Sequence, residues 1–208
     1  MAMHLQGSLF DQSDDLRLGP LDGLGRRELG TGAWVDLLPG WLGGADTLFT
    51  RLAEEVPWKA ERRQMYEQVV DVPRLLAFYG ALERLPHPVL DEAREALSAR
   101  YAVELGEPFA TAGLCYYRDG RDSVAWHGDR IGRGALEDTM VAILSVGDPR
   151  DLALRPHGGG ETLRFPLGHG DLIVMGGSCQ RTWDHAVPKS TRAVGPRISV
   201  QFRPRGVR

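Results

Sequence analysis

The chain from Phe109 onward is a succession of short apolar segments separated by glycine, proline and charged residues. Eight of these segments have strand character, namely Phe109–Tyr117, Ser123–His127, Thr139–Val146, Leu152–Arg155, Glu161–Phe165, Asp171–Met175, Thr182–Val187 and Ile198–Phe202. The glycine-containing runs at 157–160 and 168–170 predict turns between them. About eight strands of this length favour a double-sheet jelly roll, which we place at residues 109–205.

The first half of the chain favours helices instead. Apolar residues recur at helical spacing over 45–56 and again over 88–101, where Pro88 falls in the first turn. Because both helices precede the strands, we expect an α+β fold in which they pack on one sheet of the jelly roll. Residues 33–208 form a single domain in this scheme. Residues 1–32, rich in glycine, aspartate and arginine, are expected to be a mobile or irregular arm.

Composition limits the setting in which the chain works. No stretch is apolar enough to span a bilayer, so we expect no membrane partner. Two cysteines, Cys115 and Cys179, are too few for a disulfide framework and favour a reducing cytoplasm. We expect a monomer by default. The net charge of −3 excludes a uniformly basic coat, yet residues 181–208 are rich in arginine. That segment is either a phosphate-facing surface or a solvated tail.

Three potential metal ligands stand out among the polar residues. His127 ends a strand-like run, and Asp129 follows on the same side because alternate residues of a strand share a face. His185 lies in another predicted strand. Two histidines and one carboxylate can occupy one face of an iron(II) ion and leave the other positions open. A hydrolytic zinc site is the alternative, whereas the absence of Cys-x-x-Cys and His-x-x-x-His pairs argues against structural zinc.

Several further motifs accompany these ligands in a fixed order. They are Val72-Pro73-Arg74, Tyr79-Gly80, Tyr117-Arg118-Asp119-Gly120, Trp126-His127-Gly128-Asp129, Gly170-Asp171, Gln180-Arg181-Thr182-Trp183-Asp184-His185, and Pro196-Arg197 through Arg203. With these motifs spread over residues 34–205, the chain resembles the AlkB family of iron(II)- and 2-oxoglutarate-dependent dioxygenases, which repair alkylated nucleobases. The resemblance implies Fe(II), 2-oxoglutarate and O2 as cofactor and cosubstrates, and alkylated DNA or RNA as partner.

The resemblance also implies roles for individual residues. His127, Asp129 and His185 would hold the iron and, with Arg203 orienting Asp129, form the catalytic set. The cosubstrate set would be Tyr117, Arg197, Arg203, Cys115 and Ser199. Arg197 would pair with the distal carboxylate of 2-oxoglutarate, a two-pronged contact that suits a guanidinium.

Residues 62–80 would form a nucleotide-recognition lid. The expected substrate contacts are Met65, Tyr66, Phe78, Tyr79, Trp126 and Arg130. Met65 and Tyr66 fall where relatives carry a wedge that replaces a flipped base, and ordinary lid packing is the alternative. Trp126 has core packing beneath the site as its alternative role.

Three positions depart from the family pattern. Cys115 and Ser199 stand where family members usually have asparagines that help to bind 2-oxoglutarate. Ile131 stands where many repair enzymes have an acidic residue that contacts the damaged base. These departures affect the expected cosubstrate contacts and base selectivity more than the oxidation itself.

The expected activity is oxidative demethylation of N-alkylated bases in DNA, and by extension RNA, with release of formaldehyde, succinate and CO2. Fold resemblance does not fix the substrate. A 2-oxoglutarate oxygenase that acts on a protein side chain or a small molecule is therefore the second hypothesis. A binding protein that has kept the fold but turns over poorly is the third.

Overall fold

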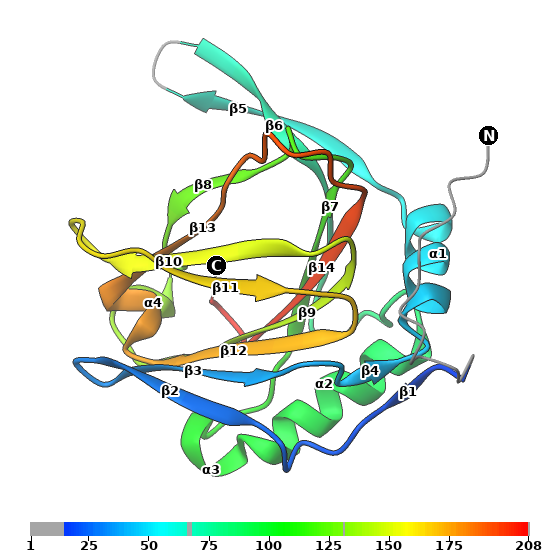
Figure 1. Ribbon diagram of the computed structural model, residues 1–208. Coiled ribbons are helices and arrows are strands. Elements are labelled where there is room, and N and C mark those ends of the chain that lie inside the picture. Colours follow the sequence, from blue (N-terminus) through cyan, green and yellow to red (C-terminus); the bar gives the residue numbers. More distant parts are fainter. Residues whose placement is uncertain (1–14, 66–67, 131, 208) are drawn as a thin grey trace.

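Two antiparallel sheets face each other in the computed structural model, which describes residues 15–65, 68–130 and 132–207 (Figure 1). The larger sheet has the strand order β2 (Gly25–Gly30), β3 (Ala33–Leu38), β12 (Asp171–Gly177), β9 (Val141–Gly147), β14 (Arg197–Arg203), β7 (Thr111–Tyr117), β6 (Gln68–Tyr79) and β5 (Lys59–Met65). The smaller sheet has the order β11 (Leu163–Leu167), β10 (Arg150–Pro156), β13 (Trp183–Val187) and β8 (Val124–His127). β1 (Arg17–Leu18) and β4 (Leu42–Gly43) form a separate pair.

This arrangement confirms the predicted jelly roll. The eight strands expected after Pro108 correspond to β7 through β14, with ends shifted by at most a few residues. β3 and the hairpin of β5 and β6 extend the larger sheet on its two sides. The hydrophobic residues between the two sheets, such as Ile143, Leu154 and Ile173, form one core.

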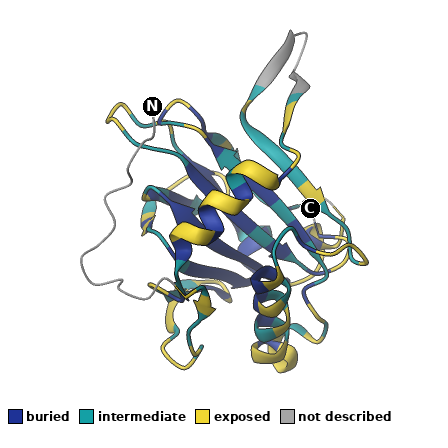
Figure 2. Cartoon of the chain, turned by 90° about the vertical axis from the view of Figure 1, so that its right-hand side faces the viewer, coloured by how far each residue is buried: buried dark blue, intermediate teal, exposed yellow. Residues whose placement is uncertain are grey.

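The two predicted helices are present and pack on one sheet, as expected. α1 (Ala45–Glu55) and α2 (Pro88–Arg100) lie on the outer face of the larger sheet, where Leu48, Leu52 and Leu97 join a second hydrophobic core. Figure 2 shows the exposed outer sides of these helices and the buried strands beneath them. The short helical segments are α3 (Ala102–Leu105), η1 (Arg133–Ala135) and α4 (Cys179–Thr182). One face of the larger sheet thus packs against the helices, and its other face packs against the smaller sheet.

The prediction of an irregular arm over residues 1–32 is wrong for residues 25–30, which form β2. This strand pairs with β3 through a turn at Thr31 and Gly32, both with positive φ. β2 is an exposed edge strand of sequence Gly-Arg-Arg-Glu-Leu-Gly, so no apolar alternation marks it. Residues 1–14 of the predicted arm lie outside the described residues.

A buried carboxylate connects β2, β3 and α2. Asp36 is 1% exposed and accepts hydrogen bonds from Arg26 Nε at 2.7 Å and Arg26 Nη2 at 2.8 Å. The hydroxyl of Tyr101, which follows α2, donates to the same carboxylate at 2.8 Å. Asp36 therefore links the edge of the larger sheet to the helical layer.

Replacing Asp36 with alanine should destabilise the fold. Removing one partner of a buried ion pair leaves the other without compensation, and because Arg26 stays partly solvated we expect a loss of about 2 to 3 kcal/mol in unfolding free energy. Tyr101→Phe removes only one hydrogen bond and should cost about 1 kcal/mol. Urea denaturation of the two variants checks both values. Equal losses would show that the ion pair adds nothing.

No helix among residues 15–65, 68–130 and 132–207 is both long and apolar enough to cross a membrane.

Candidate active site

The three predicted metal ligands come together where β8 and β13 pair. His127 and His185 are register partners, and their ring centroids are 4.2 Å apart. One ligand atom from each of His127, Asp129 and His185 lies within 4.8 Å of the others. The structure thus places the three side chains together, on the inner side of the smaller sheet, as the alternation of strand residues indicated.

The protonation states of these groups suit a metal. Burial lowers the pKa of His185 to about 3 and also lowers the pKa of His127. For Asp129, burial opposes ionisation, but Arg203 and the two histidines outweigh it and lower the pKa to about 2. At neutral pH all three groups are therefore deprotonated, as metal ligands must be. His127 Nδ1 lies 2.8 Å from the carbonyl oxygen of Ala125, which leaves Nε2 for a metal.

Arg203 on β14 orients the carboxylate of this set. Its Nε donates to Asp129 Oδ2 at 2.7 Å, and the carboxylate is almost fully buried. A charged hydrogen bond of this length fixes one carboxylate oxygen and leaves the other to face the histidines. The placement agrees with the orienting role that the resemblance implies for Arg203.

Further along β14, Arg197 is a buried cation with an unused donor. Its side chain is 1% exposed, Nε donates to Ser145 Oγ at 2.8 Å, and Nη1 has no hydrogen-bond partner among the described residues. Burial lowers the pKa of Arg197 below its ordinary value. A buried guanidinium without a counter-charge is costly, so this site fits an incoming carboxylate.

Tyr117 lies beside that guanidinium. The Cζ atom of Arg197 is 5.4 Å from the centre of the Tyr117 ring, and Tyr117 is 1% exposed. Burial raises the pKa of its hydroxyl far above the ordinary value, so the group stays a hydrogen-bond donor at neutral pH. Cys115 and Ser199 are register partners two residues along from Tyr117 and Arg197, on the side toward Arg203. The residues present thus fit both the iron and the 2-oxoglutarate that the motifs imply.

Sequence reasoning missed three residues of this region. Arg150, 5% exposed, donates to the carbonyl oxygens of Asp119, Asp122 and Pro188, and its Cζ lies 5.8 Å from the Tyr117 ring centre. Ser145 holds Arg197. Arg74 donates to the Ser123 carbonyl oxygen at 3.1 Å, and its buried Nε has no partner among the described residues. Only Arg74 had a signal, since it lies in one of the motifs quoted above.

The two aromatic residues at the end of β6 face opposite ways. Phe78 pairs with Gly113 of β7, is 60% exposed, and shares its face with Leu76 of the inter-sheet core. Tyr79 packs instead against the helix-side core. Alternation along the strand thus turns Tyr79 away from the metal, so the structure does not bring it together with the ligands, and its substrate contact stays a prediction.

Trp126 and Arg130 also point away from the metal, so the structure does not bring them together with the ligands, and their substrate contacts stay predictions. The Cζ atom of Arg155 lies 4.2 Å from the centre of the Trp126 ring. Arg155 alternates along β10 with Leu154 of the inter-sheet core, which places this contact on the outer face of the smaller sheet. The Trp126 side chain is half-exposed there, so it does not pack in the core beneath the site, which was its alternative role. Arg130 pairs with Asp184 at 2.9 Å on that same outer face.

The hairpin of β5 and β6 projects beyond the two sheets in Figure 1 and contains the predicted lid, residues 62–80. Met65 ends β5 and pairs with Gln68. Tyr66 and Ile131 lie outside the described residues. The wedge role of Tyr66, and the effect of having Ile131 where many repair enzymes have an acidic residue, therefore stay predictions.

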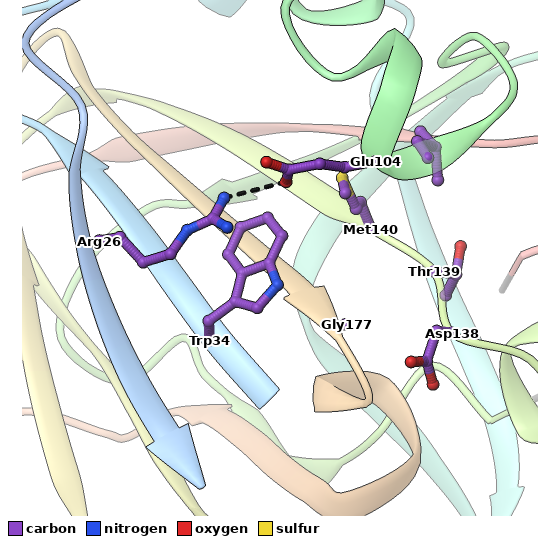
Figure 3. Close-up of a pocket in the computed structure, with 8 residues that line it drawn as sticks. Arg26, Trp34, Glu104, Asp138, Thr139, Met140 and Gly177 are labelled. Atoms are coloured by element: carbon purple, nitrogen blue, oxygen red, sulfur yellow. Dashed lines mark hydrogen bonds and ion pairs between the residues drawn. The ribbon is translucent and has the colours of Figure 1, made fainter. Parts of the chain in front are cut away.

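A separate pocket of about 350 Å³ lies beside α3 (Figure 3). Its lining residues are Arg26, Trp34, Glu104, Leu105, Asp138, Thr139, Met140 and Gly177. Arg26 lies over the Trp34 ring at 3.6 Å and pairs with Glu104 at 3.0 Å. Because none of the lining residues belongs to the metal or cosubstrate sets, we give this pocket no part in the proposed chemistry.

Comparison with known proteins identifies the family of this chain. Residues 79–203 match the 2OG-Fe(II) oxygenase superfamily. The alpha-ketoglutarate-dependent dioxygenase alkB homolog 3 of Bos taurus is 33% identical over 190 residues, covering 81% of this chain and 65% of that protein. The Homo sapiens homologue is 32% identical with the same coverage. The DNA oxidative demethylase ALKBH2 of Bos taurus is 29% identical over 182 residues, covering 76% of this chain and 64% of that protein. The chain thus spans slightly less than two thirds of the length of these relatives.

Solved structures agree on the fold. A structure described as OsALKBH1 matches with a TM-score of 0.58 at 13% identity, covering 86% of this chain and 99% of that one. A prolyl hydroxylase from Trichoplax adhaerens matches with a TM-score of 0.57 at 12% identity, covering 81% and 83%. Identities this low support the fold alone. The superfamily match over residues 79–203, together with the alkB homologues, shows that this chain belongs to the 2OG-Fe(II) oxygenase superfamily and, within it, to the AlkB family.

Proposed function

We propose that the protein is an iron(II)- and 2-oxoglutarate-dependent dioxygenase that removes N-linked methyl groups from bases in DNA or RNA. The observation that carries the proposal is the cluster of His127, Asp129 and His185 beside the buried, partly unpaired Arg197. A zinc hydrolase would have no evident use for a buried guanidinium on the facing sheet. The names of the relatives, among them a DNA oxidative demethylase, support the choice of substrate.

Bound iron, 2-oxoglutarate and O2 would supply the oxidation, which releases formaldehyde, succinate and CO2. The protein residues have positioning roles in this proposal. Arg197 and Tyr117 bind the distal carboxylate of the cosubstrate, and the burial of both keeps water from competing for their donors. Arg203 holds Asp129 in one orientation, so that the metal site is formed before the substrate arrives.

Nucleic acid would approach from the side of the β5–β6 hairpin. A methyl group inside a base stack cannot reach a buried metal, so the base must be flipped out. Phe78 offers an exposed aromatic surface on the inner face of β6. Lys189 and Arg192 are exposed in the loop before β14. A hydrogen bond of 2.8 Å from Ser190 N to the Gly120 carbonyl oxygen connects this loop to the loop after β7. These cations would contact phosphates.

A different substrate class is the alternative. Tyr79, Trp126 and Arg130, three of the six expected substrate contacts, face away from the metal. A protein side chain or small molecule could therefore be the substrate of the same iron site.

The deciding experiment measures formaldehyde and succinate with Fe(II), 2-oxoglutarate, air and a methylated oligonucleotide. We expect the two products in equal amounts, and neither from the His127→Ala variant, because that variant lacks a metal ligand. Succinate without formaldehyde would favour the alternative substrate class. Neither product from the wild-type protein would contradict both assignments and favour a binding protein.

We also propose that the protein works in the cytoplasm, because both cysteines are buried free thiols and a reducing compartment keeps thiols free. We further propose that it is a monomer. Sedimentation of the purified protein at several concentrations tests the monomer.

A further inference from the structure

Gln201 lies on β14 between the two arginines of the site and has no role in the sequence predictions. Residues 199, 201 and 203 alternate along the strand and share the face that looks into the site. Across on β7, the partner of Gln201 is Gly113. A Cβ at Gly113 would lie 3.2 Å from Arg203 Nη1 and 3.7 Å from Gln201 Oε1. Glycine at this position therefore gives the two long side chains the space they occupy.

The amide of Gln201 bridges the metal side and the cosubstrate side of the site. Its Oε1 accepts a hydrogen bond from Arg203 Nη2 at 3.0 Å, while Arg203 Nε holds Asp129. Its Nε2 donates to Ser199 Oγ at 3.0 Å and to Cys115 Sγ at 3.3 Å. Cys115 and Ser199 are two of the three positions that depart from the family pattern, the two that bear on the cosubstrate.

The chemistry of the partners fixes the direction of this bridge. A guanidinium has donors only, so the amide oxygen must face Arg203 and the amide nitrogen must face Ser199. Ser199 Oγ then accepts from Gln201, so its own hydroxyl hydrogen points away from Gln201 and remains available as a donor.

We propose that Gln201 is a positioning residue of the cosubstrate pocket, which sets the donor direction of Ser199 through a hydrogen-bonded chain that begins at Asp129. The inference rests on the proposed use of 2-oxoglutarate, but it does not depend on which substrate is oxidised. It predicts that the amide nitrogen of Gln201, rather than the volume of its side chain, determines cosubstrate affinity.

Two substitutions separate these contributions. Gln201→Glu keeps the shape and still accepts from Arg203, but it cannot donate to Ser199. Gln201→Met keeps most of the volume and has neither polar group. We expect each variant to bind 2-oxoglutarate about 10-fold more weakly, since one hydrogen bond that orients a charged interaction contributes about this factor. The readout is calorimetric titration of 2-oxoglutarate into the Mn(II)-loaded protein, which requires no turnover.

Ser199→Ala completes a double-mutant cycle. If Gln201 acts through Ser199, Gln201→Glu should weaken binding much less in the Ser199→Ala background than in the wild type. In assays of succinate formation, the KM for 2-oxoglutarate should rise while the kcat at saturating cosubstrate changes little, a split that general loosening of the fold would not produce.

Several results would overturn the inference. Binding by both Gln201 variants as tight as in the wild type would do so, and so would a loss confined to Gln201→Glu, which would show a charge effect. Additive effects in the cycle would remove the route through Ser199. A wild-type protein that binds 2-oxoglutarate but demethylates no base would contradict the proposed substrate and leave this inference supported. A wild-type protein that does not bind 2-oxoglutarate would contradict both.

Discussion

Asp129→Asn is expected to abolish turnover and to weaken binding of Fe(II), or of Mn(II) as its stand-in, by more than about 100-fold. Removing an outer partner of a metal ligand already costs about 10- to 100-fold in metal affinity, and this change acts on the ligand itself. Asparagine keeps the shape of the side chain but loses the charge that Arg203 stabilises. Titration of Mn(II) into the metal-free protein measures the effect directly.

Asp184→Asn is the matched control. Asp184 is also a buried carboxylate paired with an arginine, and it is the chain neighbour of the ligand His185. It points to the outer face of the smaller sheet, however, where its partner is Arg130. We expect this variant to bind Mn(II) as the wild type does. If both variants lost the metal to the same degree, the loss would reflect damage to the sheet, and the assignment of Asp129 as a ligand would lose its support.

The sequence was sufficient to predict the jelly-roll core because its strands have apolar residues at the right period and turn residues between them. It failed for β2, a polar edge strand whose only mark is the turn that follows it. β3 was missed for a different reason. Its run Ala-Trp-Val-Asp-Leu-Leu contains Asp36, and a buried aspartate looks like a solvent-exposed residue until its partners Arg26 and Tyr101 are known.

His127 and Asp129 were predictable as a pair because residues two apart in extended backbone share a side, although β8 itself ends at His127. The same rule applied to Trp126 would have placed it on the opposite face, so nearness in sequence to a ligand did not bring its side chain to the metal. Arg150 had no sequence signal at all. Its three acceptors are carbonyl oxygens on two loops that only the fold brings together.

Arg197→Met is expected to have two large effects of opposite sign. Truncating one side of a buried, hydrogen-bonded charge pair costs about 2 to 5 kcal/mol, so 2-oxoglutarate should bind about 30- to several-thousand-fold more weakly. Without cosubstrate, however, Arg197 is a buried charge whose Nη1 has no partner among the described residues. Replacing such a charge with an apolar side chain of similar volume is often neutral or stabilising by about 1 to 4 kcal/mol.

Thermal unfolding with and without 2-oxoglutarate, in the presence of Mn(II), tests both effects in one experiment. The wild-type protein should start at a lower melting temperature and gain stability with cosubstrate, because a ligand that binds only the folded state stabilises it. Arg197→Met should start higher and gain little. Arg197→Lys keeps a charge but loses the two-pronged geometry, so it should start no higher than the wild type and gain less. A less stable Arg197→Met variant that still gained from 2-oxoglutarate would show that Arg197 is a structural cation and that the carboxylate binds elsewhere. If instead Arg197→Met has the higher starting melting temperature and gains little from 2-oxoglutarate, the wild-type protein tolerates a destabilising buried charge because binding of the cosubstrate requires it.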